Sequence, residues 1–225
     1  MRTIRCAMIG AVAATVASAT LGAQTFSPTG SNTTGGLDNS WTVTCSTIGS
    51  VGQPACPTTA ATAATVVTAA PAGWQPVPTT DGAHYISASS SGSLWANTPD
   101  ESPHYQYMFS TTFDVANSSS SAVGFNMFAF DNYWVSGFLN GQAISITPTP
   151  ADPNGSNWQS IFNLTAANGL QDTGNVLQLT VSGNGRTDGI LVSGYSVTTT
   201  PEPSSMALLG TGLIGLVPMV RRRRK

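Results

Sequence analysis

The sequence predicts an all-β protein with one antiparallel β-sandwich of the jelly-roll type in residues 24–200, its core lying at about residues 38–198. Two observations lead to this fold class. Apolar side chains recur at every second position in several short runs, and turn-forming pairs such as Asn-Gly separate the runs. Short alternating strands with regular turns are typical of sandwiches and barrels, whereas no convincing helical period is present in this region.

The clearest strand covers residues 105–115, where Tyr105, Tyr107, Phe109, Phe113 and Val115 fall on one face. Further strands are expected at 64–67, 123–130, 177–181 and 190–197. The Thr-, Ala- and Pro-rich residues 57–78 are expected to form a long connection inside the domain, with Trp74 in the core. Turns are expected at the Asn-Ser run 117–121 and at Asn140-Gly141, Asn154-Gly155, Gly174-Asn175, Asn184-Gly185 and Asp188-Gly189.

The N-terminus has the pattern of a secretory signal peptide over residues 1–23. Arg2 and Arg5 precede an apolar run from Cys6 to Val16, and two small-residue cleavage sites follow, at 17–19 and 21–23. The apolar run is too short to span a bilayer comfortably. The sequence therefore predicts export by the Sec route.

The C-terminus combines three signals in a fixed order. Pro201-Glu202-Pro203 precedes an apolar stretch, Ser204 to Val220, and the chain closes on Arg221, Arg222, Arg223, Arg224 and Lys225. Seventeen residues at 1.5 Å rise give about 25 Å, a short membrane helix, and the basic cluster acts as a stop-transfer signal. A plain single-pass anchor fits the same hydropathy.

Residues 201–225 resemble the PEP-CTERM sorting signal, which covers this order of signals completely. The resemblance implies that Pro201, Glu202 and Pro203 are recognised by exosortase, a membrane-embedded cysteine protease-transpeptidase, and that the helix is then removed. The inner membrane is accordingly expected to hold the protein only transiently. The cell envelope, outer surface or extracellular matrix is its expected destination.

Charge is distributed unevenly. Arg186 is the only basic residue between the two ends, where it stands against nine acids, so the middle carries a net charge of about −8. Such a surface repels phosphate backbones, and the sequence therefore excludes nucleic acid as a partner. Cys45 and Cys56 are the two cysteines of the mature chain, and we expect them to form a disulfide in an oxidising compartment, two free buried thiols being the alternative.

The middle of the chain resembles galactose-binding-like jelly-roll domains over about residues 38–198. The resemblance follows, in chain order, Trp41-Thr42-Val43, Trp74, His84-Tyr85-Ile86-Ser87, Tyr105-Gln106-Tyr107, Thr112-Phe113-Asp114-Val115, Ala129-Phe130-Asp131-Asn132, Leu139-Asn140-Gly141, Gly174-Asn175-Val176-Leu177 and Asp188-Gly189-Ile190-Leu191-Val192. This middle region departs from the family in lacking lysines and in having His84-Tyr85 where a Lys-Trp type of pair is frequent. No ligand site is carried over from the family.

The sequence contains few residues that could form a catalytic site. His84 and His104 are the only histidines, and no G-x-S-x-G motif accompanies them, so we expect no Ser-His catalysis. A glycoside hydrolase would need two facing carboxylates, for which Asp131 with the Asp100-Glu101 pair are the candidates. We therefore expect a non-enzymatic protein, with a secreted carbohydrate-active hydrolase as the alternative.

Two kinds of ligand remain open. Loop carboxylates can hold a structural Ca²⁺, and the candidates are Asp38, Asp81, Asp114, Asp131 and Asp188, although isolated Asp residues in loops are also ordinary turn formers. No other cofactor is expected.

Weak carbohydrate binding is expected at Asp131, Asn132, Tyr133 and Trp134, because an aromatic face beside polar side chains suits a sugar ring. Core packing is an equal alternative for Trp134, and for Trp158, another candidate in a loop-like stretch, core packing is favoured. The sequence thus predicts a surface or matrix protein that associates with extracellular polysaccharide in an exopolysaccharide or biofilm setting.

Overall fold

The computed structural model describes residues 26–199, apart from 50–51, 58, 70, 78–80, 96, 98–99, 101, 116–120, 132, 151–155 and 167. The described chain is almost entirely β and confirms the predicted fold class. Its strands are β1 (Thr33–Thr34), β2 (Leu37–Thr47), β3 (Thr62–Val66), β4 (Ile86–Ser87), β5 (Tyr105–Phe113), β6 (Ser121–Asp131), β7 (Tyr133–Leu139), β8 (Gln142–Ala143), β9 (Ser145–Thr147), β10 (Phe162–Ala166), β11 (Asn175–Gly183) and β12 (Gly189–Thr199); one 3-10 helix, η1, covers Ser156–Gln159.

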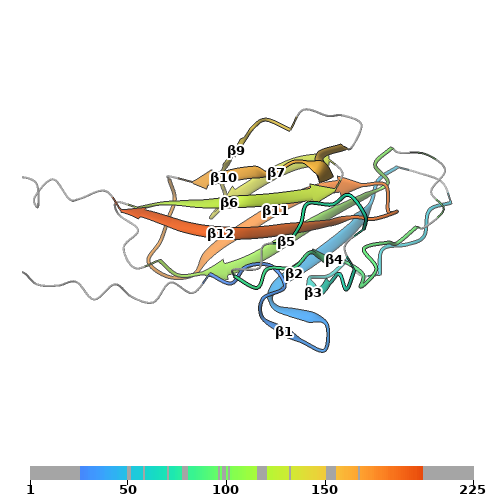
Figure 1. Ribbon diagram of the computed structural model, residues 1–225, viewed down its shortest axis with the longest axis horizontal. Helices are drawn as coiled ribbons and strands as arrows, with labels where there is room; N and C mark the ends of the chain where they lie inside the picture. The colour runs from blue at the N-terminus through green and yellow to red at the C-terminus, as the bar shows by residue number, and fades with distance from the viewer. Residues whose placement is uncertain are drawn as a thin grey trace, which may run out of the picture.

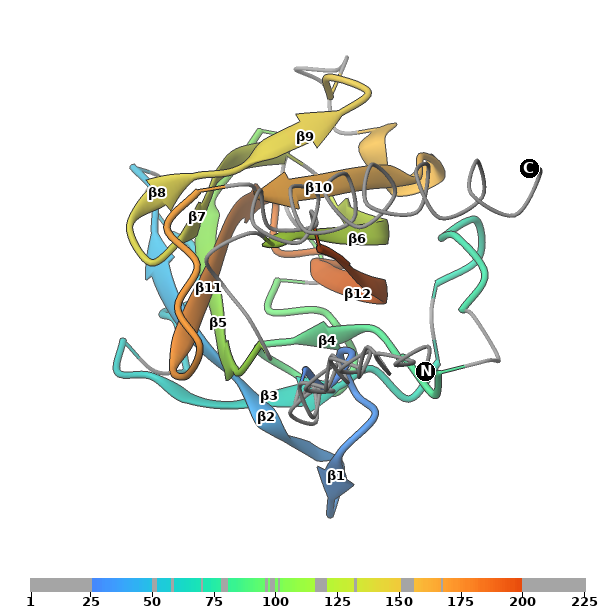
Figure 2. The same cartoon turned by 90° about the vertical axis from the view of Figure 1, so that its left-hand side faces the viewer.

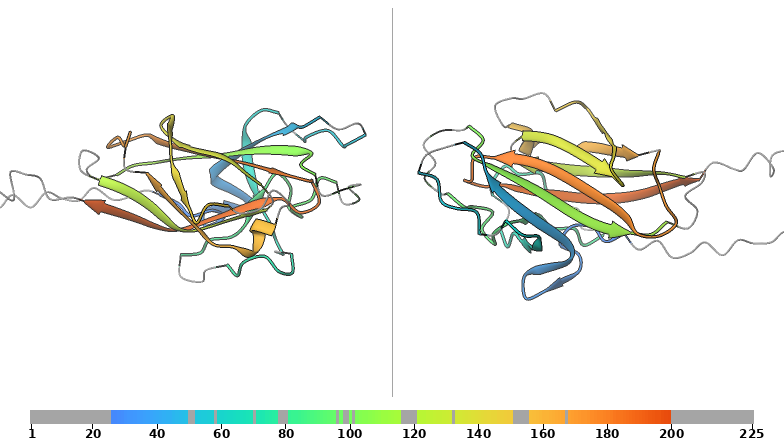
Figure 3. Two further views of the ribbon diagram at one scale, coloured as in Figure 1. Left: turned by 90° about the horizontal axis from the view of Figure 1, so that it is seen from above. Right: turned by 180° about the vertical axis from the view of Figure 1, so that it is seen from behind.

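All strands belong to one antiparallel sheet in the order β8-β7-β11-β5-β2-β3-β4-β12-β6-β10-β9, with β1 added to β2. The sheet bends so that β7, β11, β5 and β2 form one layer and β12, β6, β10 and β9 form the other (Figures 1 and 3). Seen along the strands, the sheet curls round on itself (Figure 2). Its first and last strands, β8 and β9, are joined in the chain by Ile144 alone, so the two ends of the strand order are adjacent in the sequence.

The core lies between the two layers and consists of the inward-facing side chains of alternate positions. On β5 the residues Tyr105, Tyr107, Phe109 and Phe113 are all at most 2 % exposed, as the sequence pattern predicts. The opposite layer contributes Phe125, Phe128, Phe130, Leu164, Ile190 and Val192. The predicted strands at 64–67, 123–130, 177–181 and 190–197 are confirmed as parts of β3, β6, β11 and β12, and Trp74 is buried.

The register of the strands defines two ends of the sandwich. Thr47 of β2 pairs with Tyr105 of β5, and Tyr105 pairs with Gly183 of β11; we name this the disulfide end. At the other end Thr199, the last residue of β12, pairs with Ser121 of β6; we name this the exit end, because the chain leaves the sandwich there. The two ends lie at opposite tips of the long axis in Figure 1.

The segment directly after the predicted signal peptide, for which the sequence indicated no structure, is part of the fold. The Phe26 ring packs against the rings of Trp41, Phe113, Phe125 and Tyr195, with centroid distances of 4.8 to 6.2 Å. Three residues later, the Thr29 amide donates to the Val192 carbonyl at 3.1 Å, and the Val192 amide donates to Thr29 Oγ1 at 3.0 Å. These contacts attach the N-terminal segment to β12.

The predicted hairpin turn at Asn140-Gly141 is confirmed between β7 and β8. Asn140 has φ 49° and Gly141 has φ 78°, the left-handed pair that a tight hairpin of this kind requires. The Asn140 side chain adds a second role, because its Nδ2 donates to Asn175 Oδ1 at 2.9 Å and its Oδ1 accepts from the Val176 amide at 2.7 Å. The turn is thereby connected to the start of β11.

Candidate functional site

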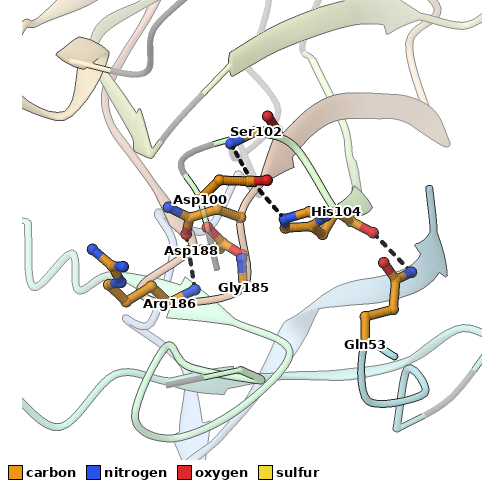
Figure 4. Close-up of polar contacts among 8 residues, drawn as sticks. Gln53, Asp100, Ser102, His104, Gly185, Arg186 and Asp188 are labelled. Atoms are coloured by element: carbon orange, nitrogen blue, oxygen red, sulfur yellow. Dashed lines mark hydrogen bonds and ion pairs between the residues drawn. The ribbon is translucent and has the colours of Figure 1, made fainter. Parts of the chain in front are cut away.

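The disulfide end gathers most of the polar residues that the sequence singled out. Cys45 and Cys56 form the predicted disulfide, with their Cα atoms 5.6 Å apart. The short loop that the disulfide closes is held against β5, since the Tyr105 hydroxyl donates to the Pro54 carbonyl at 2.9 Å and Gln53 Nε2 donates to the His104 carbonyl at 3.2 Å. Gln53 and His104 face each other in Figure 4.

His104, at the start of β5, is paired with a carboxylate. Its Nε2 lies 2.9 Å from Asp100 Oδ1, and the His104 side chain is 4 % exposed against 53 % for Asp100. The Trp95 ring packs on the imidazole at a centroid distance of 5.0 Å. The Ser102 backbone amide, and then His104, hold the pKa of Asp100 below its usual value. The pair (Figure 4) closes the loop directly before β5, since His104 immediately precedes the first strand residue, Tyr105.

Asp188, just before β12, is a buried carboxyl rather than a surface turn residue. It is 1 % exposed, and its Oδ2 accepts hydrogen bonds from the Tyr107 hydroxyl and the Gly185 amide, both at 2.7 Å. Burial raises the pKa of Asp188 to about 7, although both hydrogen bonds act in the opposite direction. β12 already begins at Gly189, so the predicted turn at Asp188-Gly189 is wrong and the bend lies at residues 185–187.

Asp131, at the end of β6, is also buried. It is 4 % exposed, and its Oδ2 accepts from Trp74 Nε1 at 2.9 Å and from Thr187 Oγ1 at 3.4 Å. Trp74 in turn packs on Tyr85 at a centroid distance of 4.4 Å, in a second hydrophobic cluster outside the main core. Burial, and then the nearby Asp131 charge, raise the pKa of Tyr85.

We expect Trp74→Phe to lower the free energy of unfolding by about 2 kcal/mol, because the smaller phenyl ring leaves part of the indole site unfilled and a buried carboxylate loses a donor. Urea denaturation followed by circular dichroism measures the change. Tyr85→Phe is the matched control, since the Tyr85 hydroxyl donates to the Gln75 carbonyl at the partly exposed rim and not to a carboxylate. Equal stability of Trp74→Phe and the wild type would contradict a stabilising role for the Trp74–Asp131 hydrogen bond.

The four residues predicted to bind carbohydrate have different surroundings. Asp131 is buried as described, and Trp134 packs on Phe128 and Phe130 at centroid distances of 5.4 and 5.9 Å. Tyr133 is half-buried, and Asn132 lies outside the described residues. Core packing, the alternative that the sequence left open for Trp134, accounts for its contacts; sugar binding by this segment stays a prediction. The side chain of Trp158 lies outside the described residues.

The carboxylates that the sequence offers as Ca²⁺ ligands accept hydrogen bonds from other groups of the chain. Asp38 accepts from the amides of Gly30 and Ser40 at 2.5 and 2.8 Å, and burial raises its pKa. Burial opposes ionisation of Asp81, but its bonds from Ser193, Gly194 and Ala83 outweigh burial and lower its pKa. Among the residues that the structure describes, no three His, Cys, Asp or Glu side chains form a group that could hold a metal ion.

Glu101, the partner of Asp131 in the hypothetical hydrolase pair, lies outside the described residues. So do the predicted signal peptide, the Pro-Glu-Pro tripeptide, the apolar stretch 204–220 and the basic tail. Within the described chain, no helix has the length and apolar character needed to cross a membrane.

Comparison with known proteins identifies the C-terminus. Residues 199–225 match the family model of the PEP-CTERM protein-sorting motif. No curated protein and no solved structure matches the chain, and the resemblance of its middle region to galactose-binding-like domains stays unconfirmed. The match begins at Thr199, which is also the last residue of β12, so the sorting motif follows the sandwich without a linker.

Proposed function

We propose that this protein, which carries a PEP-CTERM motif and is therefore exported and sorted by exosortase to the cell envelope or surface, acts there as a non-enzymatic β-sandwich. The observation that carries the proposal is the position of the motif: its match starts at the last residue of β12, so the sandwich directly precedes the sorting motif. The signal peptide would direct the chain into the Sec route, and the apolar stretch 204–220 would hold it in the inner membrane until processing.

The non-enzymatic part of the proposal is supported by how the polar side chains are used. Asp131 and Asp188 are buried and accept hydrogen bonds from Trp74 and Tyr107, and Asp100 is paired with His104. Asp131 and Asp188 each connect a loop to a strand, and the Asp100–His104 pair lies within the loop directly before β5. These contacts stabilise the disulfide end, which is the surface farthest along the strands from the membrane-directed motif.

We further propose that the protein associates with extracellular polysaccharide. The position of the motif supports it: the chain leaves the sandwich at the exit end, so the disulfide end and its loops point away from the point of attachment. Tyr133, half-buried at the start of β7, lies at this end. A protein released from the membrane at the exit end would keep this surface available.

Glu202→Ala in the full chain, expressed in the native host, tests the proposal. We expect the variant to keep residues 204–225 and to accumulate in the inner-membrane fraction, while the wild type loses them and appears in the surface and exopolysaccharide fractions. Mass spectrometry of C-terminal peptides and cell fractionation measure both results. Glu101→Ala is the matched control. Recovery of the C-terminal peptide from the mature wild-type protein would contradict exosortase processing and favour a plain single-pass anchor.

A further inference from the structure

The outer face of the layer formed by β12, β6, β10 and β9 is hollowed near the exit end. The groove has a volume of about 310 Å³. Its lining includes Ala122, Gly124, Asn126, Ser145, Thr165 and Ser196, and no charged or aromatic side chain lines it. The layer that carries the groove faces the viewer in Figure 1.

The groove exists because four small residues stand in register across four neighbouring strands. Ser196 of β12 pairs with Gly124 of β6, Gly124 pairs with Thr165 of β10, and Thr165 pairs with Ser145 of β9. Gly124 forms the floor, where a Cβ atom would lie 3.2 Å from Ser196 Oγ. Since larger outward-facing side chains normally fill such a row, their absence leaves a hollow open to solvent.

The groove lies immediately beside the point at which the chain leaves the sandwich. Ala122 in its lining pairs with Thr198, and the next pair, Ser121 with Thr199, is the last of β12. Pro201 follows two residues later, and an extended chain spans at most about 3.6 Å per residue, so its Cα lies within about 7 Å of the Cα of Thr199. An enzyme that binds the motif therefore works close to the exit end of the folded domain.

We propose that this groove is a docking surface for exosortase, which contacts it with an uncharged loop while the Pro-Glu-Pro segment enters the active site. The inference rests on the proposed function and adds a second recognition element to it. Two contacts separated by only a few residues act as one bidentate site, because docking at the groove raises the effective concentration of the segment at the active site.

The chemistry of the lining favours an uncharged protein loop over other occupants. The methyl groups of Ala122 and Thr165 suit an apolar side chain, while the hydroxyls of Ser145 and Ser196 and the amide of Asn126 can bond to a backbone. An acidic lipid head group would need basic side chains, and a sugar ring would favour an aromatic side chain. The groove is lined by neither basic nor aromatic side chains.

The test uses Thr165→Trp in the full chain, in the native host. Thr165 is exposed, so the indole fills the groove without entering the core. Thr112→Trp is the matched control, since Thr112 is an exposed Thr near the same end but on β5 of the other layer. Pulse-chase labelling measures how fast the C-terminal segment is lost, and a non-reducing gel confirms that the Cys45–Cys56 disulfide forms in each variant.

We expect Thr165→Trp to slow processing by about fivefold or more, which is the change that losing one modest contact produces. Thr112→Trp should stay near the wild-type rate. Ser145→Trp, on β9, fills the groove from the other side and should repeat the effect, so the test does not depend on the folding of one variant.

Three results would overturn the docking proposal. The first is a wild-type processing rate in both groove variants, and the second is equal slowing by Thr112→Trp. The third is a change in lipid binding, polysaccharide binding or self-association of the groove variants without any change in processing. Glu202→Ala separates this failure from failure of the proposed function. If Glu202→Ala blocks processing and the groove variants do not, the groove proposal alone is wrong. If Glu202→Ala is processed normally, motif-directed sorting is wrong.

Discussion

The free energy of unfolding is expected to fall by about 3 kcal/mol as the pH rises from about 5 to about 8, because Asp188 must ionise inside the protein. Its carboxyl has a pKa of about 7 in the folded state, against 3.8 for an exposed Asp. Between these two values the folded state binds the proton and the unfolded state does not. The contribution of Asp188 to stability is therefore largest at acidic pH and is lost as the pH rises through about 7.

The two described hydrogen bonds of Asp188 stabilise its charged form less than burial destabilises it, so its pKa stays raised. Tyr107 and Tyr105 of β5 lie near it, and burial, then the Asp188 charge, raise the pKa of both phenols. The Gly185 amide and the Tyr107 hydroxyl donate to Asp188, but neither carries a positive charge. Asp38 acts in the same direction, since burial also raises its pKa, whereas Asp81, with a lowered pKa, contributes stability that is lost only under more acidic conditions.

Asp188→Asn identifies the group responsible. The amide oxygen can accept the same two hydrogen bonds but does not ionise, so we expect a nearly flat pH profile and a variant more stable than the wild type at pH of about 8. Urea denaturation at a series of pH values measures both effects. Asp81→Asn, which removes a carboxyl whose pKa is lowered, is the control and should keep the wild-type slope between about pH 5 and 8. A wild-type profile without slope would show that Asp188 titrates normally.

Loss of the Cys45–Cys56 disulfide is expected to lower the free energy of unfolding by about 3 kcal/mol. The bond closes a short loop, with a sequence separation of 11, and so restricts the unfolded chain. It also has a local role, because that loop carries Gln53 and Pro54, which receive or make hydrogen bonds with His104 and Tyr105. Cys45→Ala with Cys56→Ala is the appropriate variant, since it leaves no free thiol.

The measurement compares urea midpoints of the oxidised wild type, the reduced wild type and the double variant. Reduction and double substitution should shift the midpoint by similar amounts, and reductant should have no further effect on the double variant. Ser46→Ala, an exposed neighbour on β2, controls for changes in the strand itself. A wild-type midpoint that does not respond to reductant would contradict the expected contribution.

Structural features that depend only on residues adjacent in the sequence could be predicted from it. Alternation along 105–113 identified β5, and Asn140-Gly141 identified a hairpin, because side-chain direction and backbone φ are local properties. The sorting motif was recognisable for the same reason: its three signals are contiguous. The two mature cysteines offered only one pairing within the chain.

Only the tertiary structure decided which polar residues are buried and where the surface is hollow. Asp131 and Asp188 look like turn residues in the sequence. In the fold both are buried and accept hydrogen bonds from Trp74 and Tyr107, which lie more than fifty residues away. Phe26 belongs to the core because Trp41, Phe113 and Tyr195 surround it. The groove needs Ser196, Gly124, Thr165 and Ser145 in one row, and strand register, which places them there, depends on the pairing of the whole sheet rather than on any single segment.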